Sequence, residues 1–159
     1  MTDPKPARPD ADLRRTLAEF SVPSEPGNER LAMERVTEAV RDLDIRGENL
    51  ERLKTAVAEA TMNAMEHGNR YNAEVPVKIE VWLLEKRVLV RIIDRGGSPP
   101  PNPNAQRPDL EAKLEGKQPP RGWGLFLIKN MVDDIRVSGN PDHHTIELLI
   151  DLKGEDDAG

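Results

Sequence analysis

Residues 48–68 read ENLERLKTAVAEATMNAMEHG, and this stretch carries the clearest structural signal in the chain. Its apolar positions advance by three, four, three and four residues, which is the spacing of one face of an α-helix. These positions are Leu50, Leu53, Val57, Ala60 and Ala64. Gly68 is a typical residue at the end of a helix. We therefore predict a helix from about Glu48 to Gly68.

The segment before this helix is expected to form a strand and a second helix. Leu13–Val22 mixes apolar and β-forming residues and stops at Pro23, which suits a strand. From Leu31 the apolar spacing becomes helical, and Gly47 ends the pattern. The apolar positions of this second helix are Leu31, Val36, Ala39, Val40 and Leu43.

The segment after it is expected to supply most of a sheet. Val75–Glu85 and Arg87–Asp94 alternate apolar and polar residues across a short break, which indicates a hairpin. Gly124–Met131 returns to helical spacing. Two further strands are expected at Asp134–Ser138 and His144–Leu152, with a turn at Gly139–Asn140–Pro141. The order predicts an α+β two-layer sandwich, with a mostly antiparallel sheet covered on one face by helices.

Length and composition limit the function. A chain of 159 residues suits one domain. With 23 basic and 29 acidic residues, it lacks the basic surface on which nucleic-acid binding usually depends. Zero cysteines exclude disulfides and thiolate metal sites, and no apolar run is long enough to span a membrane. Because the first residues also lack an apolar signal core, we expect a cytoplasmic protein with no nucleic-acid or membrane partner.

The chain is expected to hold one folded domain over residues 12–153. Residues 1–11 and 154–159 are polar, have no periodicity and are interpreted as disordered tails. Residues 95–121 carry seven of the 14 prolines and little apolar periodicity. A loop of this length inside a domain is usually functional, so we interpret it as a lid.

Polar residues on the long helix form the first candidate group. Glu59 and Asn63 are four residues apart, and His67 continues the same face. A Glu/Asn pair at the edge of the core could hold Mg²⁺ through oxygen and orient a hydroxyl group. A solvated helix face is the alternative for the pair, and helix termination is the alternative for His67.

Glycines flank the lid on both sides. Asp94-Arg95-Gly96-Gly97 follows a strand, where a carboxylate could accept a hydrogen bond from an exocyclic amine while Gly96 lets a flat ring approach. Arg121-Gly122-Trp123-Gly124-Leu125 precedes a helix, whose free amides and dipole favour an anion. Ordinary turns are the alternative at both places.

The order and spacing of these three motifs resemble the Bergerat-fold ATPases of the gyrase, heat-shock chaperone, histidine kinase and mismatch-repair superfamily. Within that superfamily, the run from Glu59 to Gly68 is most similar to the bacterial serine-protein kinase and anti-sigma factor branch. The resemblance extends over roughly Leu13 to Leu152.

The resemblance implies a role for each motif residue in binding ATP and Mg²⁺. Glu59 would be the general base that accepts a proton from a serine hydroxyl, and Asn63 would ligate Mg²⁺. Asp94 and Gly96 would bind adenine, and Thr145 would reach adenine through water. The remaining nucleotide contacts would come from His67, Arg121, Gly122, Trp123, Gly124 and Leu125.

The family also implies partners. The expected activity is phosphorylation of a small anti-sigma-factor antagonist protein by a homodimeric kinase that also binds a sigma factor. Three points stay open. Thr145 could simply be a β-former, Trp123 could be a hydrophobic anchor of the lid, and Ser98 stands where many relatives have another glycine.

There are two alternative functions. One is an ATP-binding switch module, and the other is a partner-switching kinase that regulates a phosphatase. A histidine kinase is disfavoured, because few residues precede Glu59.

Overall fold

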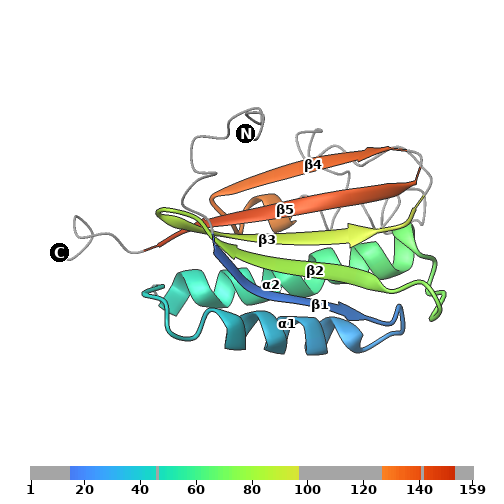
Figure 1. Cartoon of the computed structure of the whole chain (residues 1–159), viewed down its shortest axis with the longest axis horizontal. Helices are drawn as coiled ribbons and strands as arrows, with labels where there is room; N and C mark the ends of the chain where they lie inside the picture. The colour runs from blue at the N-terminus through green and yellow to red at the C-terminus, as the bar shows by residue number, and fades with distance from the viewer. Residues whose placement is uncertain (1–14, 46, 97–126, 141, 153–159) are drawn as a thin grey trace, which may run out of the picture.

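Two layers make up the fold, a five-stranded sheet and a pair of helices lying against one face of it, as Figure 1 shows for the computed structural model. The structure describes residues 15–45, 47–96, 127–140 and 142–152. In chain order the elements are β1 (Arg15–Val22), α1 (Asn28–Ala39), α2 (Gly47–Asn63), the π-helical turn η2 (Ala64–Gly68), β2 (Val77–Leu83), β3 (Arg87–Asp94), β4 (Asp134–Asn140) and β5 (His143–Asp151). The predicted α+β two-layer architecture is confirmed.

The sheet is antiparallel throughout its described strands, in the order β1-β2-β3-β5-β4. β5 pairs with β3 on one side and with β4 on the other. The hairpin of β4 and β5 therefore lies next to the hairpin of β2 and β3. This arrangement brings the end of β3 beside the start of β5, with Asp94 opposite His144. The candidate site is built at this corner of the sheet.

The core lies between the sheet and the helices. Alternate residues of a strand face the same side, and the helix-facing set on β2, β3 and β5 is almost wholly aliphatic. Each fully buried aliphatic side chain contributes roughly 1.5–3 kcal/mol relative to an exposed one. The set comprises Val77, Ile79, Val81, Val88, Val90, Ile92, Ile146, Leu148 and Ile150, and it packs on Ala32, Val36, Leu53, Ala56, Val57 and Ala60.

The helix α1 begins without a side-chain cap. Its N-cap Gly27 has φ 98°, a left-handed conformation that glycine adopts without steric cost. The backbone N–H of Gly27 donates to the Glu29 carboxylate at 2.9 Å, and a negative charge in the first turn is favourable next to the helix dipole. Glu29 therefore stabilises this end of α1, and it also enters the electrostatics of the candidate site.

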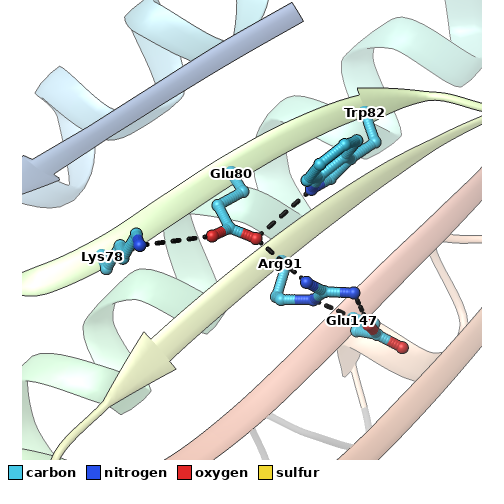
Figure 2. Close-up of polar contacts among 5 residues, drawn as sticks. All are labelled: Lys78, Glu80, Trp82, Arg91 and Glu147. Carbon is cyan, nitrogen blue, oxygen red and sulfur yellow. Dashed lines mark hydrogen bonds and ion pairs between the residues drawn. The ribbon is translucent and has the colours of Figure 1, made fainter. Parts of the chain in front are cut away.

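The face of the sheet away from the helices carries a charged group across three strands, which Figure 2 shows. Glu80, Arg91 and Glu147 are register partners on β2, β3 and β5. Arg91 Nη1 lies 3.0 Å from Glu80 Oε1, and its Nε and Nη2 each lie 2.8 Å from Glu147 Oε2. Trp82 Nε1 donates to the same Glu80 oxygen at 3.3 Å, and Lys78 Nζ is 3.4 Å from the other. We call these five residues the open-face network.

Two sequence expectations about element positions are wrong. Leu31 is 41% exposed and the neighbouring Ala32 is buried, whereas Val36 is buried as expected. Gly139 and Asn140 belong to β4 rather than to a turn, because the strand pairing continues to Asn140 opposite His143.

Other boundaries agree with expectation. The hairpin of β2 and β3 is where it was predicted, and the long predicted helix is helical throughout, although its last turn is η2. Of the helix predicted at Gly124–Met131, residues 127–131 are described; 127–129 are helical and 130–131 form a turn. Most of the predicted lid, and both predicted tails, lie outside the described residues. Across the described part of the chain, no helix has the length and apolar character that a membrane span needs.

Candidate nucleotide-binding site

The polar pair on α2 lies at the border of the core, as predicted. Leu53, Val57 and Ala60 face the sheet, and Glu59 and Asn63 sit beside that apolar stripe. Asn63 is only 8% exposed and Glu59 is partly buried. The pKa of Glu59 is raised above its ordinary value, mainly by burial and to a smaller extent by the negative charge of Glu29. A carboxylate with a raised pKa is a stronger base, which suits proton abstraction near neutral pH.

The end of the helix changes from α to π geometry. In η2 the backbone N–H of Asn69 donates to the Ala64 carbonyl at 2.8 Å, five residues back, and Tyr71 donates to Met65 at 2.7 Å. Arg70 and Tyr71 then have φ of 53° and 54°, which is uncommon for residues other than glycine. Short π segments are frequent at functional sites. This wider turn carries the chain from the polar pair on α2 to the sheet.

Gly68 is where α2 meets the sheet. A methyl group built at Gly68 would collide with the carboxylate of Asp94 at the end of β3. Gly68 therefore does more than end the helix, because it lets the Asp94 side chain lie directly on the backbone of η2. The contact joins the motif on the helix to the motif at the strand end.

Asp94 is a buried carboxylate with defined partners. It is 4% exposed, and its Oδ1 accepts the backbone N–H of Gly96 at 2.7 Å. The imidazole Nδ1 of His144, which is 1% exposed, lies 3.2 Å from the same oxygen. A carboxylate can accept several hydrogen bonds, so Asp94, which accepts the Gly96 N–H, is suited to accept a further one, such as one from an exocyclic amine.

Asn69 holds the strand end in place, and sequence reasoning missed it. Its Oδ1 accepts the backbone N–H of Arg95 at 2.8 Å. Its Nδ2 donates to Ser24 Oγ and to the Val75 carbonyl, each at 3.0 Å, and lies 3.3 Å from the Pro76 carbonyl. One buried amide thus connects the segment after Asp94 to the loops that follow β1 and precede β2. Its position directly after Gly68 was the only signal in the sequence.

The remaining predicted residues fall into three groups. Gly96 is buried against Asp94 and His144, and His67 is partly buried with its Nε2 3.6 Å from Glu66. Thr145 pairs with Ile93 and, because adjacent strand residues face opposite sides, it lies on the open face, whereas His144 is on the site face with Asp94. The other predicted contacts lie outside the described residues, namely Arg121, Gly122, Trp123, Gly124 and Leu125.

The residues present are compatible with Mg²⁺ bound together with phosphates. No cluster of three or more His, Asp or Glu side chains able to hold a metal occurs among the residues that the structure describes. Mg²⁺ in nucleotide sites usually takes one or two protein oxygens and completes its shell with phosphate and water. The side-chain oxygen of Asn63, nearly buried one turn after Glu59, fits that limited role.

Comparison with known proteins gives the same assignment. The model of the histidine kinase-like ATPase domain matches residues 22–150. The anti-sigma F factor of Bacillus subtilis is 32% identical over 127 residues, which cover 80% of this chain and 84% of that protein. The anti-sigma F factor of Bacillus thuringiensis is 34% identical over 122 residues, or 77% of this chain and 81% of that protein.

Two solved structures share the fold. The chain with the RsbU and RsbW domains of Rv1364c from Mycobacterium tuberculosis has a TM-score of 0.61 at 17% identity, over 85% of this chain and 32% of that one. A chain of the SiaB–SiaC complex from Pseudomonas aeruginosa has a TM-score of 0.61 at 14% identity. The match covers 86% of this chain and 90% of that one. The chain belongs to the histidine kinase-like ATPase family and, within it, to the serine-protein kinase and anti-sigma factor group. Membership of an ATPase family implies nucleotide binding.

Proposed function

We propose that the chain is an ATP- and Mg²⁺-dependent serine-protein kinase that acts as an anti-sigma factor in the cytoplasm. Its substrate is a small anti-sigma-factor antagonist protein, and its other partners are a sigma factor and a second copy of the chain. The observation that carries the proposal is the contact of Gly68 with Asp94. Through this contact the helix with Glu59 and Asn63 and the buried carboxylate Asp94 form one site.

The proposed chemistry is an in-line phosphoryl transfer. A serine hydroxyl oxygen of the antagonist attacks the γ-phosphorus of ATP, the bond to the β–γ bridging oxygen breaks and ADP leaves. Glu59 accepts the hydroxyl proton, and its raised pKa makes it a better base than an ordinary glutamate. Mg²⁺, held by Asn63, would neutralise phosphate charge.

Nucleotide contacts are assigned to the surrounding motifs. Asp94 would accept a hydrogen bond from the adenine amine, with Gly96 beside the ring. His67 and the 121–125 segment would contact phosphates. Thr145 was expected to reach adenine through water. Because it lies on the open face of the sheet, that contact would instead come from a β5 residue on the face that the helices cover.

The test is transfer of radiolabelled phosphate from ATP to the antagonist of the same organism, together with calorimetric titration of Mg·ATP. Glu59→Gln should slow transfer by roughly 10²–10⁴-fold with little change in ATP affinity. Asn63→Ala should weaken both Mg·ATP binding and transfer. The exposed Glu51→Gln, on the same helix, is the matched control and should transfer at the wild-type rate.

The pH profile adds a separate check. Glu59 must be ionised to act as a base, so transfer should decline as the pH falls through its pKa. Since that pKa is raised, the decline should begin at a higher pH than the ordinary glutamate value of about 4.3 would give. Wild-type protein that binds ATP but phosphorylates no antagonist would establish the switch-module alternative. Capture of a phosphatase instead of a sigma factor would establish the phosphatase-regulating alternative.

A further inference from the structure

A hollow lies on the sheet at the end where β3 terminates in Asp94. Its volume is about 530 Å³, within the range of about 300–1,000 Å³ that small-molecule pockets occupy. Four strands contribute one lining residue each, namely Ser21 on β1, Lys78 on β2, Ile93 on β3 and His143 on β5. We call this hollow the end pocket.

The strand register places the end pocket on the face opposite the candidate nucleotide site. Ser21, Lys78 and Ile93 are register partners across three neighbouring strands. Lys78 lies two residues before Glu80 and so shares its face, which carries the open-face network (Figure 2). Alternation along β3 agrees, because Ile93 precedes Asp94, and Asp94 contacts η2 on the helix-covered face. A ligand in the end pocket would therefore not occupy the space of ATP.

Two permanent cations line the end pocket. The Arg95 side chain is exposed, and its guanidinium makes no ion pair or hydrogen bond with the described part of the chain. Lys78 has a side chain that is 50% exposed, with Nζ 3.4 Å from Glu80, and an ammonium group has three donors. Asp142 adds one carboxylate to the lining. In a chain with a net charge of −6, a hollow with two cations and one carboxylate favours an anion.

The backbone holds Arg95 at this position. Its N–H donates to Oδ1 of Asn69 at 2.8 Å, and Asn69 is buried. The two neighbours of Arg95 are also joined, since the Gly96 N–H donates to the Asp94 carboxylate at 2.7 Å. The base of the Arg95 side chain is therefore ordered before a ligand arrives, which lowers the entropy cost of binding.

The lining indicates the chemical class of the anion. A phosphate monoester carries a charge of about −1.5 to −2 near neutral pH, which two cations match better than they match a single carboxylate. Arginine binds two phosphate oxygens at once, and lysine binds phosphate as a point charge. The Ser21 hydroxyl can donate a further hydrogen bond. Pro76 and Ile93 add apolar surface beside these groups, which suits an apolar body attached to the phosphate.

We propose that the end pocket binds a small phosphate monoester. The phosphate lies on Arg95 and Lys78, and the organic group lies against Ile93 and Pro76. The site goes beyond the proposed function, because it is on the other face of the sheet and requires no phosphoryl transfer.

The test is calorimetric titration of the full chain with phenyl phosphate, with saturating Mg·ADP present to fill the nucleotide site. Inorganic phosphate should bind more weakly because it lacks the apolar ring, and benzoate should bind more weakly because it has a single charge. Arg95→Met and Lys78→Met should each weaken phenyl phosphate binding roughly tenfold, the lower limit for a lost bond to a charged group. Asp142→Asn should strengthen it, because a negative charge is removed from the lining.

Exposed cations outside the end pocket supply the matched controls. Arg52→Met on α2 and Lys86→Met in the turn between β2 and β3 should leave phenyl phosphate binding unchanged. Arg95→Met should keep the fold, because the contact of Arg95 with Asn69 is made by its backbone. If Lys78→Met does not fold, Arg95→Met and Asp142→Asn decide.

Several outcomes would overturn the proposal. One is wild-type protein without saturable binding of phenyl phosphate, and another is wild-type affinity in the folded Arg95→Met variant. Benzoate or inorganic phosphate that binds as tightly as phenyl phosphate would exclude a site for a phosphate monoester. Failure to bind Mg·ADP would count against the proposed function alone, and the titrations would then be read without nucleotide. Normal Mg·ADP binding with no phenyl phosphate binding would count against the end pocket alone.

Discussion

Asn69 illustrates how one side chain can determine the geometry of a site without belonging to any motif. Its amide bonds to the segment after Asp94 and to two other loops, and it is only 6% exposed. Asn69→Ala would leave the Arg95 N–H and nearby carbonyls without this partner. A buried group left unpaired costs about 1–3 kcal/mol, so we expect that loss in the free energy of unfolding, together with weaker ATP binding.

Urea unfolding with ATP titration measures both effects. The control is Asn72→Ala, since Asn72 is exposed and its side-chain oxygen accepts the N–H of the nearby Glu74. It should change stability much less. Asn69→Asp keeps the oxygen that Arg95 uses but turns an acceptor toward the Val75 and Pro76 carbonyls. If Asn69→Asp proves as stable as wild type, the donor half of this assignment is incorrect.

Residue types and spacing were sufficient to place Glu59 and Asn63 on the long helix and Asp94 at the end of a strand. Asn69 and His144 could not be located in the same way. Their roles depend on partners far away in the sequence, such as Ser24 for Asn69 and Asp94 for His144. Thr145 was expected at the site, but it lies on the open face of the sheet. β5 is buried at Ile146 and at Leu149, which lie on opposite faces, so alternation does not reveal its orientation.

At the scale of the element, the junction of α2 and η2 connects the helix to the strand end. Gly68 permits the contact with Asp94, whereas Gly47, in the first turn of α2, has open space around its missing Cβ. The two glycines therefore form a matched pair for the same substitution. Gly68→Ala forces Asp94 to move, and we expect a loss of about 1–3 kcal/mol from overpacking with much weaker ATP binding.

Gly47→Ala should instead gain about 0.4–1 kcal/mol, because alanine restricts the unfolded chain. Its ATP affinity should match wild type. Thermal unfolding and ATP titration of both variants give the comparison. Equal ATP affinity in Gly68→Ala and Gly47→Ala would contradict the idea that the Gly68–Asp94 contact shapes the site.

The elements themselves were mostly predictable, and the exceptions have physical causes. Apolar spacing identified α2 because its stripe is long and regular. The same spacing cannot distinguish the π-helical turn η2 from an α-helical turn. The segment has only five residues, so the wider turn hardly alters the pattern of apolar positions. In the α1 region, Leu31 was assigned to the apolar face because it is large, but it is exposed and the small Ala32 is buried, whereas Val36 and Val40 were assigned correctly. The β4–β5 turn was placed too early because Gly139 looks like a turn residue, but it is in a strand and makes room for His144.

On the scale of the whole molecule, the two faces of the sheet have different chemistry. The helix-covered face holds the aliphatic core and the candidate site. The open face carries the open-face network, next to a small apolar cluster of Leu84, Leu89 and Leu149. Because β3 and β5 contribute to both faces, the strands that position Asp94 and His144 are also joined by the bond between Arg91 and Glu147.

The open-face network should make global stability depend on pH. Burial alone would raise the pKa of Glu80, but the Trp82 hydrogen bond, the charge of Arg91 and the contacts of Lys78 outweigh it and hold the pKa below its ordinary value. The unfolded chain then binds this proton more readily than the folded one, so stability rises with pH in that range. The contribution is fully present above the unfolded pKa of about 4.3 and is lost as the pH falls through the lower folded pKa.

Glu80→Gln removes this titration while keeping the size of the side chain and an oxygen for Arg91. Urea unfolding between about pH 7 and pH 3, a range that spans the ordinary glutamate pKa, should show wild type losing more stability than Glu80→Gln as the pH falls. The control Glu85→Gln removes an exposed carboxylate outside the network and should follow the wild-type curve. If wild type and Glu80→Gln differ by the same free energy at every pH, Glu80 contributes packing and hydrogen bonds but no favourable charge. The network would then join the strands without making the stability of the molecule sensitive to acid.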